Sequence, residues 1–154
     1  LQRLISFFGS GKDKLGTGYQ LTQSLIAFGS GGIFGKGIGG SVEKFLYLPA
    51  GYNDFIYSIV GEELGFIGSL IVIGLFVVLG VEGFRIALNQ EDEIEGLIAG
   101  GFTFVICFQA LLNFSVTLGL LPFTGLTLPF ISYGGSSLIV SLAMIGCIVN
   151  IGNS

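Results

Sequence analysis

Long apolar stretches, rather than alternating apolar and polar positions, dominate the second half of the chain. A membrane-crossing helix needs about 20 apolar residues, and three stretches reach that length. The predicted spans are residues 64–88, 97–121 and 128–152, joined by a short acidic connector at 89–96 and a turn at 122–127. So short a connector predicts that the first two spans form an antiparallel hairpin. The pattern indicates an all-α, polytopic membrane protein built as a helical bundle.

Residues 1–63 follow a different pattern and predict a large polar loop outside the hydrocarbon. Apolar residues recur at helical spacing over residues 21–28, which predicts a short amphipathic helix at the membrane interface, ended by Gly29. Residues 29–40 then hold seven glycines in twelve positions, so we expect this segment to be mobile. Its GxGxxG spacing is not a dinucleotide site, because no strand precedes it and no βαβ unit follows.

Charge is confined to the part of the chain before the second span. Residues 96–154 contain no Asp, Glu, Lys or Arg, whereas all six bases and six of the ten acids precede Gln90. The net charge of −4 provides no basic patch for nucleic acid. The chain lacks an initiator Met and a basic leader, so we expect a piece of a larger membrane protein. Counting Lys and Arg would place the long loop, which holds five of the six bases, in the cytoplasm.

The first span begins with a candidate catalytic carboxylate. Asp54, Ser58 and Glu62 follow at four-residue steps, so a helix continuous from Asp54 would carry them on one face. The apolar core puts the hydrocarbon edge near Glu62, and Asp54 would stand about 12 Å beyond it, among the headgroups. A lipid-linked polar substrate would present its head there. The alternative is that Asp54 only caps the helix.

Two more charged residues belong to this group of candidates. Glu62 is costly at the membrane edge unless it has partners, so it is a site candidate as well as a carboxylate favoured by the helix dipole. Lys44 is either a simple interface anchor or a cation that faces the substrate.

A second motif, residues 121–137, interrupts what would otherwise be apolar helix with two prolines and several small polar residues. Irregular backbone at membrane depth is tolerated only where it is buried in protein or lines a cavity. We expect a re-entrant turn that borders a polar cavity; the alternative is a tight loop between two spans.

These motifs resemble the C-terminal portion of the SEDS family, the FtsW and RodA type of peptidoglycan glycosyltransferase. Within that family, the sequence of residues 125–129 is closer to the division branch. The matching pieces are residues 18–24 (GYQLTQS), 34–39 (FGKGIG), Lys44, 47–49 (YLP), 54–56 (DFI), 61–65 (GEELG) and 126–137 (LTLPFISYGGSS). They cover nearly the whole chain in order. The resemblance implies a ten-helix membrane protein whose large extracytoplasmic loop precedes the last three helices. This places the long loop outside the cytoplasm, contrary to the Lys and Arg count.

The resemblance also implies an activity and the residues that carry it. Lipid II would be polymerised into glycan strands with inversion at the anomeric carbon, and Asp54 falls on the family's catalytic aspartate. Tyr52 and Asn53 replace the usual His and Thr, so no imidazole stands beside it. Lys44 would offset charge on the pyrophosphate leaving group, a task that a divalent cation could share although the sequence shows no ligand cluster. Further substrate contacts are expected from Pro49, Glu62, Ser132, Tyr133 and Ser136.

The implied partners are lipid II, membrane lipid, a class B penicillin-binding transpeptidase and divisome proteins, at the septum of a bacterial plasma membrane. Two other functions remain open on the sequence: a lipid II flippase or transporter, and a scaffold that recruits a transpeptidase without catalysis. The position of Asp54 distinguishes them, because a polymerase needs this carboxylate outside at the headgroups. We also expect the 154-residue chain to be inactive alone.

Overall fold

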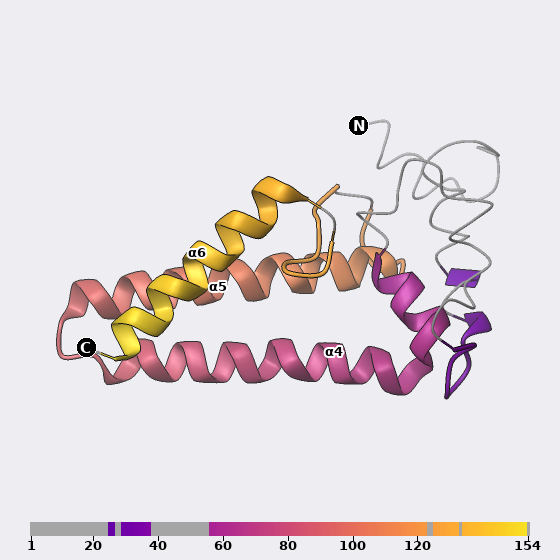
Figure 1. Cartoon of the computed structure of the whole chain (residues 1–154), viewed down its shortest axis with the longest axis horizontal. Coiled ribbons are helices and arrows are strands. Elements are labelled where there is room, and N and C mark those ends of the chain that lie inside the picture. The colour runs from indigo at the N-terminus through magenta and orange to yellow at the C-terminus, as the bar shows by residue number, and fades with distance from the viewer. Residues whose placement is uncertain (1–24, 27–28, 38–55, 123–124, 133, 154) are drawn as a thin grey trace.

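The computed structural model describes residues 25–26, 29–37, 56–122, 125–132 and 134–153 of the 154-residue chain. Three long helices make up most of this part: α4 (Ile56–Asn89), α5 (Glu93–Thr117) and α6 (Gly135–Gly152). Figure 1 shows α4 and α5 side by side and antiparallel, with α6 crossing the pair obliquely. The described residues include no strand, and the predicted all-α class is confirmed.

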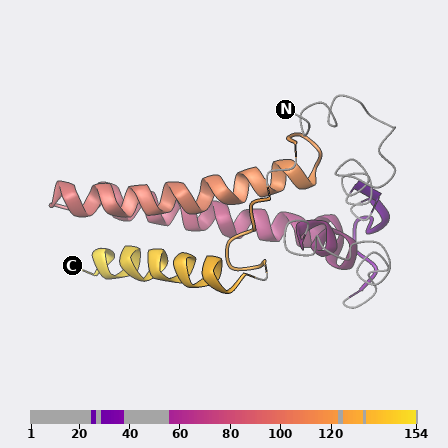
Figure 2. The same ribbon diagram turned by 90° about the horizontal axis from the view of Figure 1, so that it is seen from above.

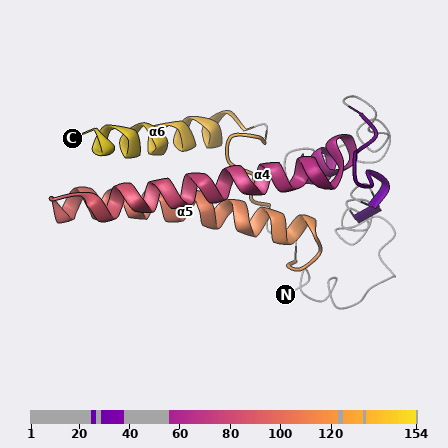
Figure 3. The same cartoon turned by 90° about the horizontal axis from the view of Figure 1, so that it is seen from below.

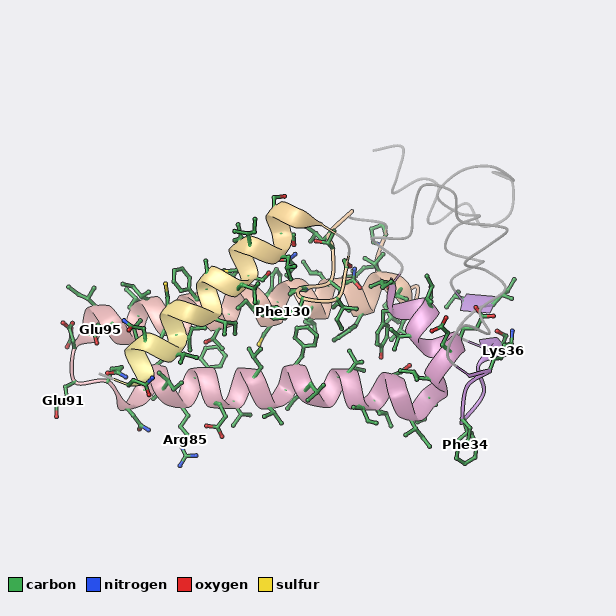
Figure 4. The ribbon with its side chains drawn as sticks, in the orientation of Figure 1. Phe34, Lys36, Arg85, Glu91, Glu95 and Phe130 are labelled. Carbon is green, nitrogen blue, oxygen red and sulfur yellow. The ribbon has the colours of Figure 1, made fainter. Side chains whose placement is uncertain are left out.

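Each of the three helices has the length and apolar composition needed to cross a membrane. Residues 64–81 of α4 are free of charge and would extend about 27 Å along a helix axis, close to the roughly 30 Å of a hydrocarbon core. In Figure 4, Lys36 lies at one end of the bundle and Glu91 and Glu95 lie at the other. The charged side chains therefore gather at the two ends, with apolar helix between them.

A tight polar connector turns α4 into α5. Asp92 caps α5, since its Oδ1 accepts a hydrogen bond of 2.8 Å from the Ile94 N–H. Glu93 and Glu95 occupy the first turn, where carboxylates are stabilised by the helix dipole. α5 therefore starts at Glu93, four residues before the predicted span, because the acidic residues that mark the connector also begin the helix.

Small residues bring α4 and α5 into close contact along the hairpin. A Cβ atom on Gly83 would overlap the Thr103 side chain, and one on Gly80 would lie 3.0 Å from the Cys107 sulfur. Thr103 is fully buried and donates its hydroxyl to the Ala99 carbonyl at 2.8 Å. Close approach of this kind replaces the hydrophobic effect as the main source of helix association in lipid.

α6 packs on one side of the α4–α5 pair, as the two turned views show (Figures 2 and 3). Its last turn is tied to the connector end of α4, where Gln90 Nε2 donates to the Ile151 carbonyl at 2.7 Å. The helix begins at Gly135, whereas the sequence places the start of the third span at Leu128. Residues 128–132 are apolar enough to suggest helix, but a proline and a residue with positive φ make them a turn.

Candidate functional site

The glycine-rich segment meets α4 at a break in that helix. Gly65 has φ 70° and ψ −164°, which interrupts the helical hydrogen bonds of α4. Residues 31–37 lie against the break and supply the missing partners; we call residues 31–37 together with 61–67 the loop–helix splice. Its four joining bonds are Lys36 N to Glu62 O (3.0 Å), Gly37 N to Glu63 O (3.0 Å), Phe66 N to Gly32 O (2.9 Å) and Ile67 N to Ile33 O (3.4 Å).

Glycine is required on both sides of the splice. At Gly65 the positive φ favours glycine, and a Cβ atom there would overlap the Gly35 nitrogen and lie 2.6 Å from the Ile33 oxygen. At Gly31 an added Cβ would overlap the Gly61 carbonyl oxygen and lie 2.9 Å from the Glu62 Cα. The sequence predicts a mobile glycine segment, whereas residues 31–37 are bonded to α4. Two of its glycines, Gly31 and Gly35, allow this close approach.

A buried ion pair lies in the splice. Glu62 has no exposed surface, and its Oε1 is 2.8 Å from Lys36 Nζ, while the Ser30 hydroxyl donates to the same oxygen at 3.4 Å. The Lys36 side chain keeps 37% of its surface exposed at the end of the bundle (Figure 4). A carboxylate buried at this depth needs a paired cation and hydrogen bonds, and Lys36 provides the cation.

The two parts of the broken helix are also fastened by side chains. Tyr57, in the first turn of α4, donates its hydroxyl to the Ser69 carbonyl beyond the break at 3.2 Å. Ser69 in turn donates its own hydroxyl to the Gly65 carbonyl at 3.0 Å. The Tyr57 ring packs on Phe114 of α5, with ring centroids 4.5 Å apart. The angle of the break is therefore fixed from three directions: the glycine segment, α4 itself and α5.

The segment between α5 and α6 turns back into the bundle. Gln109 Nε2 donates to the Thr127 carbonyl at 2.8 Å, and Asn113 Nδ2 donates to the Leu126 carbonyl at 2.7 Å. Both donors project from α5. The buried Leu128 joins Tyr57 and Phe114 in one apolar cluster. The start of α4 and this re-entrant segment, residues 125–132, therefore share a core.

A tight turn closes the re-entrant segment. The Leu128 N–H donates to Ser132 Oγ at 2.8 Å, and the Ser132 N–H donates to the Leu128 carbonyl at 3.0 Å. Phe130 between them has φ 66°, a left-handed conformation that a bulky residue rarely adopts, and its ring stacks on Phe76 at 6.3 Å. Figure 4 shows Phe130 among the helices rather than at an end. Leu128, Pro129 and Ser132 of this turn are buried, whereas Leu126 and Ile131 are exposed, so the irregular backbone is partly covered by protein.

Comparison with known proteins identifies the chain. Residues 1–154 match the family FTSW_RODA_SPOVE, described as cell cycle protein. The chain belongs to the FtsW/RodA/SpoVE family. It is 50% identical over 153 residues to the probable peptidoglycan glycosyltransferase FtsW of Alcanivorax borkumensis, covering 97% of the chain and 40% of that relative. It is 46% identical over 151 residues to the stage V sporulation protein E of Bacillus subtilis, covering 98% of the chain and 41% of that protein.

Two solved structures extend this likeness within the FtsW/RodA/SpoVE family. One is described as showing structural coordination of polymerization and crosslinking by a peptidoglycan synthase complex; the TM-score is 0.77 at 32% identity, over 99% of this chain and 41% of that one. The other is a mutant of the rod shape determining protein RodA of Thermus thermophilus. The TM-score is 0.65 at 36% identity, over 86% of this chain and 40% of that one. The chain thus spans about 40% of the length of the relatives it matches.

The residues that the sequence selects fall into two groups. Glu62, Ser132 and Ser136 are described: Glu62 and Ser132 are buried, whereas Ser136 is exposed at the start of α6. Ser58 and Glu62 are both fully buried, and the face predicted to join them to Asp54 stays a prediction. The other candidates, Lys44, Pro49, Asp54 and Tyr133, lie outside the described residues. The described acids and cysteines form no group of three that could hold a metal ion.

Several residues of the site are not apparent from the sequence pattern. Lys36 is the partner that Glu62 requires. The sequence feature that could have indicated it is that Lys36 is the one cation inside the glycine-rich segment, residues 29–40. Gln109 and Asn113 lie within the second predicted span, and both bond to the re-entrant segment. Residues 29–30 are helical, so Gly29 does not end the predicted helix.

Proposed function

We propose that the chain is the C-terminal, catalytic part of a peptidoglycan glycosyltransferase that polymerises lipid II into glycan strands during cell division. The observation that carries this proposal is the ordered match of residues 1–154 to the family, with relatives named probable peptidoglycan glycosyltransferase FtsW at 50% and 48% identity. In the reaction, the C4 hydroxyl of the acceptor GlcNAc attacks the C1 carbon of the donor MurNAc. Undecaprenyl pyrophosphate leaves and the anomeric centre is inverted.

Asp54 is the proposed general base, which takes the proton from the attacking hydroxyl. General base catalysis by a positioned carboxylate contributes typically about 10²- to 10⁴-fold to a rate. Asp54 precedes α4 by two residues in the sequence, and we propose that it lies at the membrane edge, where a lipid-linked headgroup is presented. The neighbouring Tyr52 and Asn53 offer no imidazole, so the proposed mechanism uses the carboxylate alone.

The remaining candidates are proposed to bind the substrate. Lys44 offsets the negative charge that develops on the pyrophosphate leaving group. Pro49, Ser132, Tyr133 and Ser136 shape the site around the sugars and the lipid carrier. A direct contact between Glu62 and the substrate stays a prediction, and full burial of its side chain is unfavourable to it.

The proposed setting is the septum of a bacterial plasma membrane, with the long loop on the outer side. A class B penicillin-binding transpeptidase is the proposed partner, with other divisome proteins around it. The solved complex in which polymerization and crosslinking are coordinated supports such a pairing, because crosslinking of glycan strands requires a transpeptidase.

Asp54→Asn in the full-length protein tests the catalytic assignment. Asn is nearly isosteric and is a good helix cap, so a capping role predicts little change. A general base predicts a rate loss of about 10²-fold or more, equivalent to roughly 3 kcal/mol of barrier. The assay combines purified protein, its transpeptidase partner and lipid II, and glycan length is read on a gel. Polymerisation at the wild-type rate would refute the assignment and favour a flippase or a scaffold.

A further inference from the structure

We propose that Lys36 and Glu62 are positioning residues for polymerisation: their ion pair holds the first turns of α4 at a fixed angle. The inference rests on the proposed function, because the group to be positioned is Asp54, which comes two residues before α4 in the sequence. Neither residue needs to touch the substrate. Their effect passes through the loop–helix splice.

The break at Gly65 makes the start of α4 a separate piece of helix. Residues 56–64 lack the continuous hydrogen bonding that would fix their direction relative to the membrane-spanning remainder. Their direction instead depends on contacts across the break, which are the four backbone bonds of the splice and the Tyr57 hydroxyl on the Ser69 carbonyl. A helix interrupted in this way is a hinge unless such contacts hold it.

The ion pair is the charged contact at the centre of the splice. The Lys36 backbone N–H donates to the Glu62 carbonyl, while its ammonium group pairs with the Glu62 carboxylate at 2.8 Å. One residue therefore binds both the main chain and the side chain of its partner. The Glu62 carboxylate is buried and shielded from water and salt, whereas the Lys36 side chain keeps 37% of its surface exposed. Loss of the pair weakens the attachment of the glycine segment to the break, which then rests on the four backbone bonds.

Position matters because catalysis depends on alignment. A displacement of about 1 Å at the reacting groups can reduce a rate by roughly 10²-fold without altering the chemistry of any catalytic group. Asp54 stands only eight residues before Glu62 in the chain, so a change in the angle of residues 56–64 moves the point from which Asp54 projects. The expected signature is a fall in kcat with little change in KM.

The decisive variant is the neutral pair Lys36→Met/Glu62→Gln in the full-length protein, assayed with lipid II and the transpeptidase partner. Lys36→Met alone leaves an unpaired buried carboxylate and tests folding rather than position. Lys36→Arg keeps the positive charge and should retain the wild-type rate. The matched control is Arg85→Met, which removes an exposed ion pair with Glu82 (3.8 Å) from the other end of the same helix. Melting temperature and amide hydrogen exchange at Lys36 and Phe66 are measured on every variant.

We expect the neutral pair to lower kcat roughly 10- to 100-fold, at unchanged KM and near-wild-type melting temperature, with faster exchange at Lys36 and Phe66. Arg85→Met should match wild type. A neutral pair with wild-type kcat would overturn the inference, as would a loss of activity that only follows the loss of folded protein. A raised KM at constant kcat would assign the pair to substrate binding instead. Full activity of Asp54→Asn would instead refute the proposed function, and exchange at Phe66 would still report whether the ion pair holds the splice.

Discussion

Gly31 approaches α4 so closely that an added methyl group would overlap the Gly61 carbonyl. Gly29, two residues earlier in the chain, has no atom within 4 Å of the same added group. The sequence indicates only that this segment is rich in glycine, and composition alone suggests mobility. Which glycines are structural depends on the partner surface, which lies about 30 residues away in the chain. Likewise the sequence predicts that Glu62 needs a partner, but the three-dimensional fold selects Lys36.

Gly31→Ala should therefore destabilise the splice, whereas Gly29→Ala should not. Forcing an extra carbon into a packed position costs typically about 1–3 kcal/mol, because the backbone on one side must move. The measurement is hydrogen exchange at the amides of Lys36 and Gly37, which donate to α4. Equal protection in both variants would show that the segment can shift away from α4 without loss.

At the scale of elements, apolar run length predicts the three helices well, because a membrane span is a compositional feature. The breaks and the ends of these helices are less predictable from the sequence. The break at Gly65 is invisible to composition, since glycine also occurs inside ordinary helices, for example at Gly74 of the same α4. The start of α6 is displaced from Leu128 to Gly135 because side chains of α5 bind the carbonyls of residues 126 and 127 and hold the chain in a turn. Such long-range bonds cannot be inferred from local pattern.

Asn113→Leu should loosen the re-entrant segment while leaving α5 helical. The substitution keeps the size of the side chain but removes the donor to the Leu126 carbonyl, at a cost of about 1–3 kcal/mol. We expect faster hydrogen exchange at the amides of Leu128 and Ser132. Ser115→Ala is the control, because its hydroxyl bonds only to the Leu111 carbonyl of the same helix. Indistinguishable exchange in the two variants would mean that the core around Leu128 suffices to hold the turn.

At the scale of the whole molecule, the three helices leave much apolar surface uncovered. A groove of about 860 Å³ runs between α4 and α5, lined by side chains such as Phe76, Val77 and Phe84 of α4 and Leu111 of α5. The all-α class implied by the family resemblance is confirmed, and the motifs include both the start of α4 and the re-entrant segment. The sequence does not predict how these two regions meet, because Tyr57 and Leu128 come together only through the packing of α4 on α5.

The 154-residue chain alone should not polymerise lipid II. It spans about 40% of the length of its relatives, and the groove between α4 and α5 is the kind of surface that further helices cover in a larger bundle. The test is the gel assay for glycan strands with the purified chain in lipid nanodiscs, beside the full-length protein at equal concentration. Glycan strands made by the isolated chain at a comparable rate would show that these residues contain the complete active site.

The splice also closes a stretch of chain on itself. Gly37 is bonded to the Glu63 carbonyl, and α4 begins at Ile56, about 10 Å away along the same helix. The 18 residues 38–55 are therefore tethered at both ends to a few turns of one helix. They include the candidate residues Lys44, Pro49 and Asp54. The entropy cost of closing a flexible loop rises by only about 0.6 kcal/mol for each doubling of its length. By this relation a change in the length of residues 38–55 would alter the closure entropy only slightly, so the candidate residues inside the segment constrain it more than chain entropy does.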